Sequence, residues 1–336
     1  MSLRPILRLC RSLLGGRMIY AHWGLTHRCN LGCRMCAVRR DPRPELPLPQ
    51  LATAAEALRE LGVAALSLGG GEPFLRDDLE GILAMLREKG FRFRVLTNGT
   101  LADEARVRGL AAAGLREVSV SLHSLDPAKH DSIHGSAGVH APVLKSLEVF
   151  AKLLAGSGGI LLINTVVSPL NIRELPAIAD FAAGLGFSVS FVPIEDASCP
   201  ELAFKPEDQG LIDEVYGRLA ELQRNGGAVF NSAAFLEQSR LHLASRRRVW
   251  RCEAGRRYCS VDPSGQLSIC HRFIPEGSLL DGALRQRLGS AAYQERRRAL
   301  ADACPGCLRP CWAEVTNAFA GPAGLLGLAR QALRRP

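Results

Sequence analysis

The 336-residue chain has few aromatic residues and no long apolar run. Phe, Trp and Tyr make up only 6% of it, and no known nucleic-acid-binding motif occurs, which argues against a nucleic acid partner. No run approaches the roughly 18 apolar residues that a membrane-spanning helix needs. The first 17 residues also lack the continuous apolar core and the cleavage site of a signal peptide. We therefore expect a cytoplasmic protein.

Acidic residues are fewer than basic ones, 33 against 42, so the formal net charge is +9. Most of the excess is arginine, which predicts a solvated basic face or, alternatively, an acidic partner. Residues 1–19 and 319–336 each combine an apolar stripe with arginines and are predicted to form amphipathic helices. Such helices pack on the body of a protein or lie on a membrane surface, so peripheral membrane contact stays open.

Cysteine, in contrast, is plentiful. Eleven cysteines in a chain without an export signal indicate reduced thiols and metal ligation rather than disulfides. Cys29, Cys33 and Cys36 form a C-x3-C-x2-C run in which no fourth cysteine follows at motif spacing. Three thiolates this close suit one iron–sulfur cluster that leaves one iron without a protein ligand. An open iron is able to bind a small molecule and act on it.

Residues 20–193 alternate between apolar strand-like runs and helical patterns, and several of the helical patterns end in glycine. Six strands alternating with helices predict an α/β fold, a partial (β/α)6 TIM-like barrel, with its chemistry at the carboxyl ends of the strands. We expect the barrel at 20–198, a helical connector at 199–250 and a small cysteine-rich domain at 251–318.

Polar groups stand at the predicted strand ends. The second strand runs into Gly-Gly-Gly-Glu-Pro at 69–73, where missing side chains allow a ligand to approach the backbone closely. The third, fourth and fifth strands offer further short hydrogen-bonding groups, at Thr97, Asn98, Ser121, His123 and Asn164. These groups are predicted to face one common edge of the barrel.

The cysteine run, the Gly-Gly-Gly-Glu-Pro segment, Thr97-Asn98-Gly99 and Ser-Leu-His-Ser at 121–124 occur in the order and spacing of radical S-adenosylmethionine (SAM) enzymes, which residues 20–193 resemble. The resemblance implies a [4Fe–4S] cluster on Cys29, Cys33 and Cys36 whose open iron binds SAM. It implies that SAM is cleaved reductively to a 5′-deoxyadenosyl radical, which takes a hydrogen atom from a substrate. A one-electron reductant such as a flavodoxin or ferredoxin is the implied partner.

The same resemblance implies which residues contact SAM. They are Met35, Gly70, Gly71, Glu72, Pro73, Thr97, Asn98, Ser121 and Asn164. Two positions depart from the family pattern. Met35 stands where an aromatic residue is common, and His123 stands where an acidic residue is common. We predict His123 as a catalytic proton donor or substrate contact, with a neutral hydrogen-bonded histidine as the alternative.

Six further cysteines lie near the C-terminus, at Cys252, Cys259, Cys270, Cys304, Cys307 and Cys311. Their spacing resembles the twitch extension of this family, which is related to the longer SPASM extension. The resemblance implies an auxiliary [4Fe–4S] cluster on Cys252, Cys270, Cys304 and Cys307, with Cys259 and Cys311 as further candidate ligands. A structural zinc site is the alternative.

The sequence thus predicts a radical SAM enzyme with an auxiliary cluster that acts on a ribosomal peptide or a small metabolite. Only 28 residues precede Cys29, so we expect a peptide substrate to dock directly or through a separate protein. Two alternatives stay open: modification of a lipid at a membrane surface, and a non-catalytic iron–sulfur or zinc protein.

Overall fold

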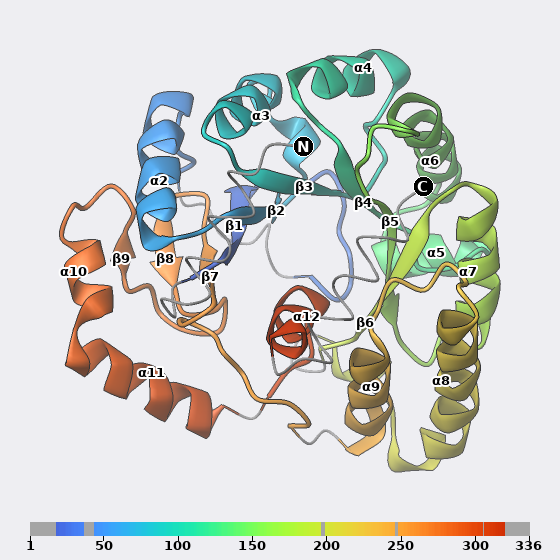
Figure 1. Ribbon diagram of the computed structural model, residues 1–336. Coiled ribbons are helices and arrows are strands. Elements are labelled where there is room, and N and C mark those ends of the chain that lie inside the picture. The colour runs from blue at the N-terminus through green and yellow to red at the C-terminus, as the bar shows by residue number, and fades with distance from the viewer. Residues whose placement is uncertain (1–17, 37–43, 196–198, 246–247, 305, 320–336) are drawn as a thin grey trace.

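The computed structural model describes residues 18–36, 44–195, 199–245, 248–304 and 306–319. The amphipathic helices predicted at 1–19 and 319–336 lie outside these residues, apart from 18, 19 and 319. Six parallel strands pair in chain order and curve into a ring (Figure 1), with bounds β1 Tyr20–Thr26, β2 Ala65–Gly70, β3 Arg92–Thr97, β4 Glu117–Ser121, β5 Leu161–Val167 and β6 Ser188–Pro193. This arrangement confirms the predicted partial barrel.

Five of the helices between these strands cover the outside of the ring (Figure 1), and they are α2 Leu48–Leu61, α3 Leu79–Glu88, α4 Glu104–Ala113, α6 His140–Leu154 and α7 Leu175–Gly184. Each presents apolar residues to the sheet, as Leu51 and Leu58 of α2 do with 1% or less of their surface exposed. The predicted glycine ends are present. Gly62 and Gly114 adopt φ of 102° and 119°, which lets the chain leave α2 and α4 in the left-handed conformation.

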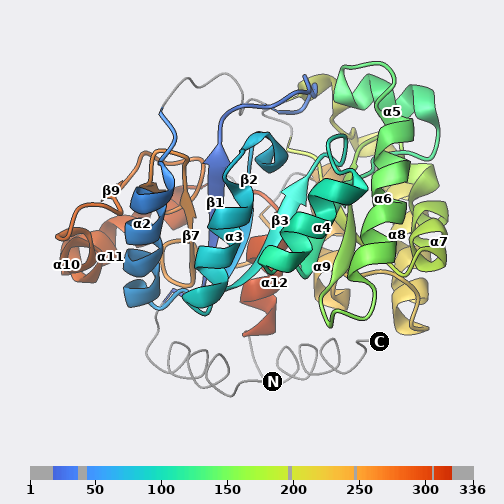
Figure 2. The same cartoon turned by 90° about the horizontal axis from the view of Figure 1, so that it is seen from above.

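A sixth helix, α5 Pro127–His134, escaped the sequence analysis because it is short and mostly polar. Its start is built from Asp126, whose carboxylate accepts a hydrogen bond from the Lys129 backbone N–H at 3.0 Å, and from Pro127 in the first turn. It ends at Gly135, where φ is 62°. This helix lies at the same end of the barrel as the loop that carries the first three cysteines (Figure 2).

The cysteine-rich region continues the sheet of the barrel. Strand β7 Tyr258–Val261 pairs in parallel with β1, and β8 Gln266–Ser268 and β9 Gly277–Ser278 follow as antiparallel strands. The hairpin between β7 and β8 turns at residues 262–265, where the Asp262 carboxylate accepts hydrogen bonds from the backbone N–H groups of Ser264 and Gln266. The described sheet therefore has nine strands, in the order β6-β5-β4-β3-β2-β1-β7-β8-β9. The predicted boundary at 251 stays a prediction.

The remaining helices complete the molecule. The predicted connector contains α8 Gln209–Arg224 and α9 Ala233–Ser245, and the C-terminal region contains α10 Leu284–Gly289, α11 Ala291–Ala303 and α12 Pro310–Ala318. Short 3-10 helices are η2 Pro73–Leu75, η3 Ile172–Glu174, η4 Pro200–Leu202 and η5 Pro206–Asp208. Helix α12 lies inside the ring of strands (Figure 1), toward the end opposite the first cysteine loop (Figure 2). None of the helices in the described ranges has the length and apolar content to cross a bilayer.

Candidate functional site

The loop after β1 carries Cys29, Cys33 and Cys36 at the carboxyl end of the strands, as predicted. Cys29 and Cys33 are partly buried and Cys36 is exposed. Burial raises the pKa of the Cys29 thiol, while hydrogen bonding from the Leu31 backbone and the Asn98 side chain opposes that rise. Within the loop, the Cys36 backbone N–H donates to the Cys33 carbonyl at 3.1 Å. The loop is thus compact and receives polar groups from a neighbouring strand.

Glu72 joins the end of β2 to the end of β3. Its buried carboxylate accepts hydrogen bonds from the Phe74 backbone N–H at 3.1 Å, the Thr97 hydroxyl at 2.8 Å and the Asn98 backbone N–H at 2.7 Å. Burial raises the pKa of Glu72 to about 7, and the three hydrogen bonds oppose that rise. The Asn98 side-chain amide in turn donates to Asn30 Oδ1 in the cysteine loop at 2.9 Å. The structure therefore brings Glu72, Thr97 and Asn98 together beside the loop.

Gly70 and Gly71 allow two backbones to meet. A Cβ atom on Gly71 would lie 2.0 Å from the Arg28 carbonyl oxygen, and one on Gly70 would lie 2.3 Å from the Thr26 carbonyl oxygen. The Gly71 backbone N–H donates to the Thr26 carbonyl at 2.7 Å, which holds the start of the cysteine loop against β2. The sequence analysis explained these glycines by the approach of a ligand; in the structure they also admit the chain's own loop. Pro73, which follows, is buried and begins η2.

A cavity of about 410 Å³ occupies the inside of the ring. Two of the predicted residues, Met35 from the cysteine loop and Asn164 from β5, line it. Ser121, which pairs with Asn164 across β4 and β5, is half-buried. Other polar side chains from the strands line the cavity and were not singled out from the sequence: His22, Ser67, Arg94, Ser119 and Ser190. In the sequence, each of these residues could have been recognised as a polar residue within a predicted strand.

The far side of the cavity is closed by the C-terminal region. Arg309, Pro310 and Cys311, at the start of α12, line it together with Glu195, which follows β6. Burial alone would raise the pKa of Glu195, but contacts with His271 and Arg309 hold it well below its usual value. Burial also lowers the pKa of His22 in the cavity wall to about 4, so that imidazole is neutral at pH 7. The cavity thus contains fixed charges of both signs.

Four histidines form a buried column at the end of α5, which we call the histidine column: His123, His130, His134 and His140. The ring centroids of His123 and His134 lie 4.8 Å apart with an interplanar angle of 14°, and those of His130 and His134 lie 4.4 Å apart. The Nδ1 atom of His134 lies 3.2 Å from the Cys33 sulfur. His123 is 2% exposed, and its Nδ1 accepts a hydrogen bond from the Val166 backbone N–H at 3.3 Å. The catalytic role predicted for His123 stays a prediction.

The sequence analysis singled out His123 but missed the other three histidines of the column, whose clearest sign is the spacing of His130 and His134. Residues four apart on a helix share one face, so both rings point to the same side of α5. Burial, followed by the neighbouring imidazoles, lowers the pKa of His130 to about 3, and burial lowers that of His134 to about 4. The rings of His130 and His134 are therefore neutral at pH 7.

Among the six C-terminal cysteines, four are electrostatic neighbours. Cys270 lies within electrostatic range of Cys252 and Cys304, and Cys307 within range of Cys252. Burial raises the pKa of the Cys270 thiol to about 11, and Cys252 and Cys304 add to this rise. Burial, followed by Glu195, raises the pKa of the Cys307 thiol to about 12. Across the described ranges, no three His, Cys, Asp or Glu side chains converge closely enough to hold a single metal ion.

The other two C-terminal cysteines, Cys259 and Cys311, lie on β7 and at the start of α12. Cys259, on β7, is fully buried, and burial raises the pKa of its thiol to about 12. Cys311 lies in the cavity wall beside Tyr20. The role predicted for both, as further candidate ligands, stays a prediction.

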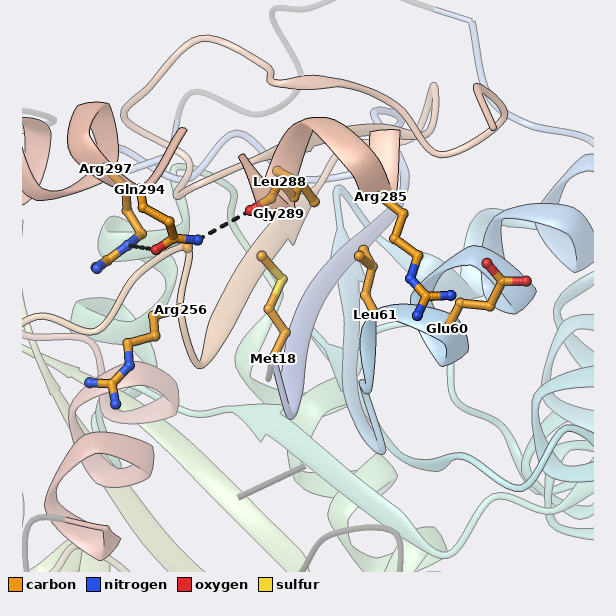
Figure 3. A pocket seen from close by; sticks show the side chains of 10 residues that line it. Met18, Glu60, Leu61, Arg256, Arg285, Leu288, Gly289, Gln294 and Arg297 are labelled. Atoms are coloured by element: carbon orange, nitrogen blue, oxygen red, sulfur yellow. Dashed lines mark hydrogen bonds between the residues drawn. The ribbon is translucent and has the colours of Figure 1, made fainter. Parts of the chain in front are cut away.

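The residues that line a second cavity, of about 370 Å³, are shown in Figure 3. Met18 precedes β1 and Leu61 ends the helix before β2, so this cavity is at the amino ends of the strands. Three arginines line it, at positions 256, 285 and 297. Figure 3 shows Arg297 beside Gln294, whose amide donates to the Leu288 carbonyl at 3.1 Å. No cysteine or histidine lines it, so the candidate site is the cavity inside the ring.

The chain is similar in sequence to known proteins over the barrel that carries the candidate site. Residues 23–182 match the family model of the radical SAM superfamily. The chain is 31% identical over 165 residues to the PqqA peptide cyclase of Granulibacter bethesdensis, an alignment that covers 48% of this chain and 43% of that protein. It is 28% identical over 261 residues to the PqqA peptide cyclase of Gluconobacter oxydans, covering 75% of this chain and 70% of that protein. The chain spans about half the length of several curated relatives that it matches.

A solved structure shares the fold over a longer stretch. SuiB of Streptococcus suis, bound to the precursor peptide SuiA, superposes with a TM-score of 0.66 over 88% of this chain and 71% of that chain. The sequences are 16% identical, so the match shows the fold alone. Because it covers 88% of the residues, the shared fold extends beyond residue 250 into the cysteine-rich region.

Proposed function

Because this chain belongs to the radical SAM superfamily, we propose that it is an enzyme that binds a [4Fe–4S] cluster and SAM at the carboxyl end of its barrel and modifies a substrate held in the cavity of about 410 Å³. When bound, the cluster and SAM supply a 5′-deoxyadenosyl radical that takes a hydrogen atom from the substrate. A one-electron reductant, such as a flavodoxin or ferredoxin, is the proposed partner.

The chemistry of the donor set supports Cys29, Cys33 and Cys36 as the cluster ligands. Cys29 is approached by the Leu31 backbone and the Asn98 amide, and Cys33 by His134 Nδ1. N–H groups directed at sulfur favour the thiolate, which is the form that ligates iron. Glu72, Gly70 and Gly71 then act by holding the loop and the strand ends in position.

The observation that carries the proposal is the position of Met35. This residue precedes Cys36 in the loop and also lines the cavity. A substrate in the cavity therefore lies beside the loop, in the arrangement that transfer of a hydrogen atom between bound molecules needs. We propose that Met35, Asn164 and Ser121 contact SAM, and that Thr97, Asn98 and Pro73 shape the same edge.

The proposed substrate is a segment of a ribosomal peptide, with a small metabolite as the second candidate. A volume of about 410 Å³ falls within the range of small-molecule pockets, so it fits one metabolite or a few side chains of a peptide. The lining includes Arg94 and the ion-paired Arg309 and Glu195, so the cavity presents charges of both signs, which suits the paired charges of peptides and amino acids. The similarity to PqqA peptide cyclases supports the peptide.

We further propose that Cys252, Cys270, Cys304 and Cys307 hold an auxiliary [4Fe–4S] cluster. The proximity of Cys270 to Cys252 and Cys304, and of Cys307 to Cys252, supports this set. Arg309 lies two residues after Cys307 and lines the cavity. A cluster in this position lies close enough to the cavity to exchange an electron with a substrate or to brace its wall.

The test is SAM cleavage by anaerobically reconstituted protein. With dithionite and SAM, the protein should release 5′-deoxyadenosine, and the reduced cluster should give a paramagnetic signal that SAM perturbs. The Cys33→Ala variant should lose both. A non-catalytic electron carrier would be reduced without releasing 5′-deoxyadenosine, and this result would refute the proposed activity.

A further inference from the structure

The end of α5 is fixed against the cysteine loop by three contacts. The Cys33 sulfur lies 3.2 Å from His134 Nδ1. Beside it, the Arg34 backbone N–H donates to the Ile133 carbonyl at 3.2 Å. Gly135 lies so close to the loop that a Cβ atom there would stand 2.7 Å from the Gly32 carbonyl oxygen. Backbone contacts on both sides of His134 therefore set the distance between the imidazole and the sulfur.

The orientation of the His134 ring is fixed as well. The ring is stacked on His123 and packed against His130, with centroids 4.8 and 4.4 Å away. Only 1% of His134 is exposed, so water does not compete for its nitrogen atoms. Its Nε2 atom is buried and has no hydrogen-bond partner among the described residues. The polar contact that the structure gives to this ring is the one with Cys33.

We propose that His134 is a positioning residue whose Nδ1–H donates a hydrogen bond to the Cys33 thiolate and so raises the reduction potential of the SAM-binding cluster. This inference rests on the proposed cluster at Cys29, Cys33 and Cys36. A thiolate carries no proton, so the hydrogen atom in the contact belongs to Nδ1. Reduction makes the cluster sulfurs more negative, and a hydrogen-bond donor stabilises the reduced state more than the oxidised one.

The histidine column explains how the donor is kept in place. His130 Nδ1 accepts a hydrogen bond from the His123 backbone N–H at 3.3 Å, which ties α5 to the end of β4. His140, at the far end of the column, packs against His130 with centroids 5.3 Å apart. A substitution at His140 therefore removes a histidine from the column without touching the sulfur, and it serves as the matched control.

The experiment measures the potential of the cluster whose signal SAM perturbs, in reconstituted full-length protein. His134→Phe keeps an aromatic ring but removes the donor. At a fixed ambient potential its ratio of reduced to oxidised cluster should fall about tenfold, which is 59 mV for a one-electron couple. His134→Asn places an N–H near the former Nδ1 and should restore the wild-type value, while His140→Asn should leave it unchanged.

A second measurement does not depend on the stability of a variant. In wild-type protein with 15N-labelled histidine, pulsed paramagnetic spectroscopy of the reduced cluster should detect a coupled histidine nitrogen. Absence of that coupling, or an equal potential in wild type and His134→Phe, would overturn the inference. Absence of any SAM-perturbed signal in the wild type would instead count against the proposed function. The two ideas thus fail separately.

Discussion

Arg309 Nε donates a hydrogen bond to Glu195 Oε1 at 2.5 Å, and this ion pair connects the C-terminal cysteine segment to the end of β6. Arg272 Nη2 reaches the second oxygen of the same carboxylate at 3.3 Å. Two residues that flank cysteines in the sequence thus meet one acidic residue of the barrel. Ion pairs, as well as the pairing of β7 with β1, therefore connect the cysteine-rich region to the barrel.

Replacing Arg309 should weaken this junction. We expect Arg309→Met to lower the free energy of unfolding by about 1 kcal/mol at pH 7, because both partners keep some exposure to water. Glu195 has a lowered pKa in the folded state, so the stabilisation is present above its usual 4.5 and is lost as the pH falls. The difference from wild type in urea denaturation should therefore shrink below pH 4.5. Arg309→Lys keeps the charge, and an equal loss in this variant would contradict the ion-pair explanation.

The two groups of C-terminal cysteines should behave differently. Cys270→Ala should reduce the iron content of anaerobically purified protein from that of two clusters to that of one, and should leave SAM binding intact. Cys259→Ala is the matched control, since Cys259 is fully buried and lies outside the proposed ligand set, and the iron content of this variant should equal that of wild type. Elemental analysis that finds stoichiometric zinc, with unchanged iron in Cys270→Ala, would favour the structural zinc site.

A substitution at Gly71 tests whether the cysteine loop needs its close approach to the end of β2. A Cβ atom would lie 2.0 Å from a carbonyl oxygen of the loop, which is backbone and cannot turn aside. We expect Gly71→Ala to displace the loop, to lower stability by roughly 2 kcal/mol and to reduce iron in the SAM-binding site. Gly217→Ala, in the middle of α8 with open space around it, should be neutral or slightly stabilising. Full iron loading of Gly71→Ala would show that the loop tolerates the added methyl group.

Glu72 should make the stability of the cluster-free protein depend on pH. Its folded pKa of about 7 lies above its usual 4.5, so the stability linked to this group is present below pH 4.5 and is lost as the pH rises through 7. The difference between these two pKa values corresponds to a change of about 3 kcal/mol in the free energy of unfolding. Between pH 4.5 and 7, unfolding free energies of wild type should therefore fall more steeply than those of Glu72→Gln. Parallel slopes in the two proteins would mean that Glu72 titrates normally.

Much of the barrel was predictable because its strands are continuous apolar runs and its helices end in glycines. The strand-like runs around Trp23, Leu68 and Val120 all became buried strands, since parallel strands covered on both faces need apolar residues throughout. The grouping of Cys29, Cys33 and Cys36 on one loop was predictable from spacing alone, because the three residues are close in sequence.

The rest depends on contacts between distant segments. Helix α5 has eight residues and little apolar periodicity, so its formation depends on Asp126, Pro127 and Gly135 rather than on a pattern. The contact of His134 with Cys33 joins positions 101 residues apart, which spacing does not reveal. The same holds for β7: four residues are too few to identify a partner, and its pairing with β1 follows from the assembled fold.

That pairing affects how the protein can be divided. A chain shortened before Cys252 would leave the backbone of Tyr20–Trp23 as an uncovered sheet margin, able to pair with another molecule. Such a fragment would tend to self-associate, and its inactivity would say nothing about the cysteines that had been removed. Point substitutions, rather than truncation, are therefore the way to separate the contributions of the two ends of this chain.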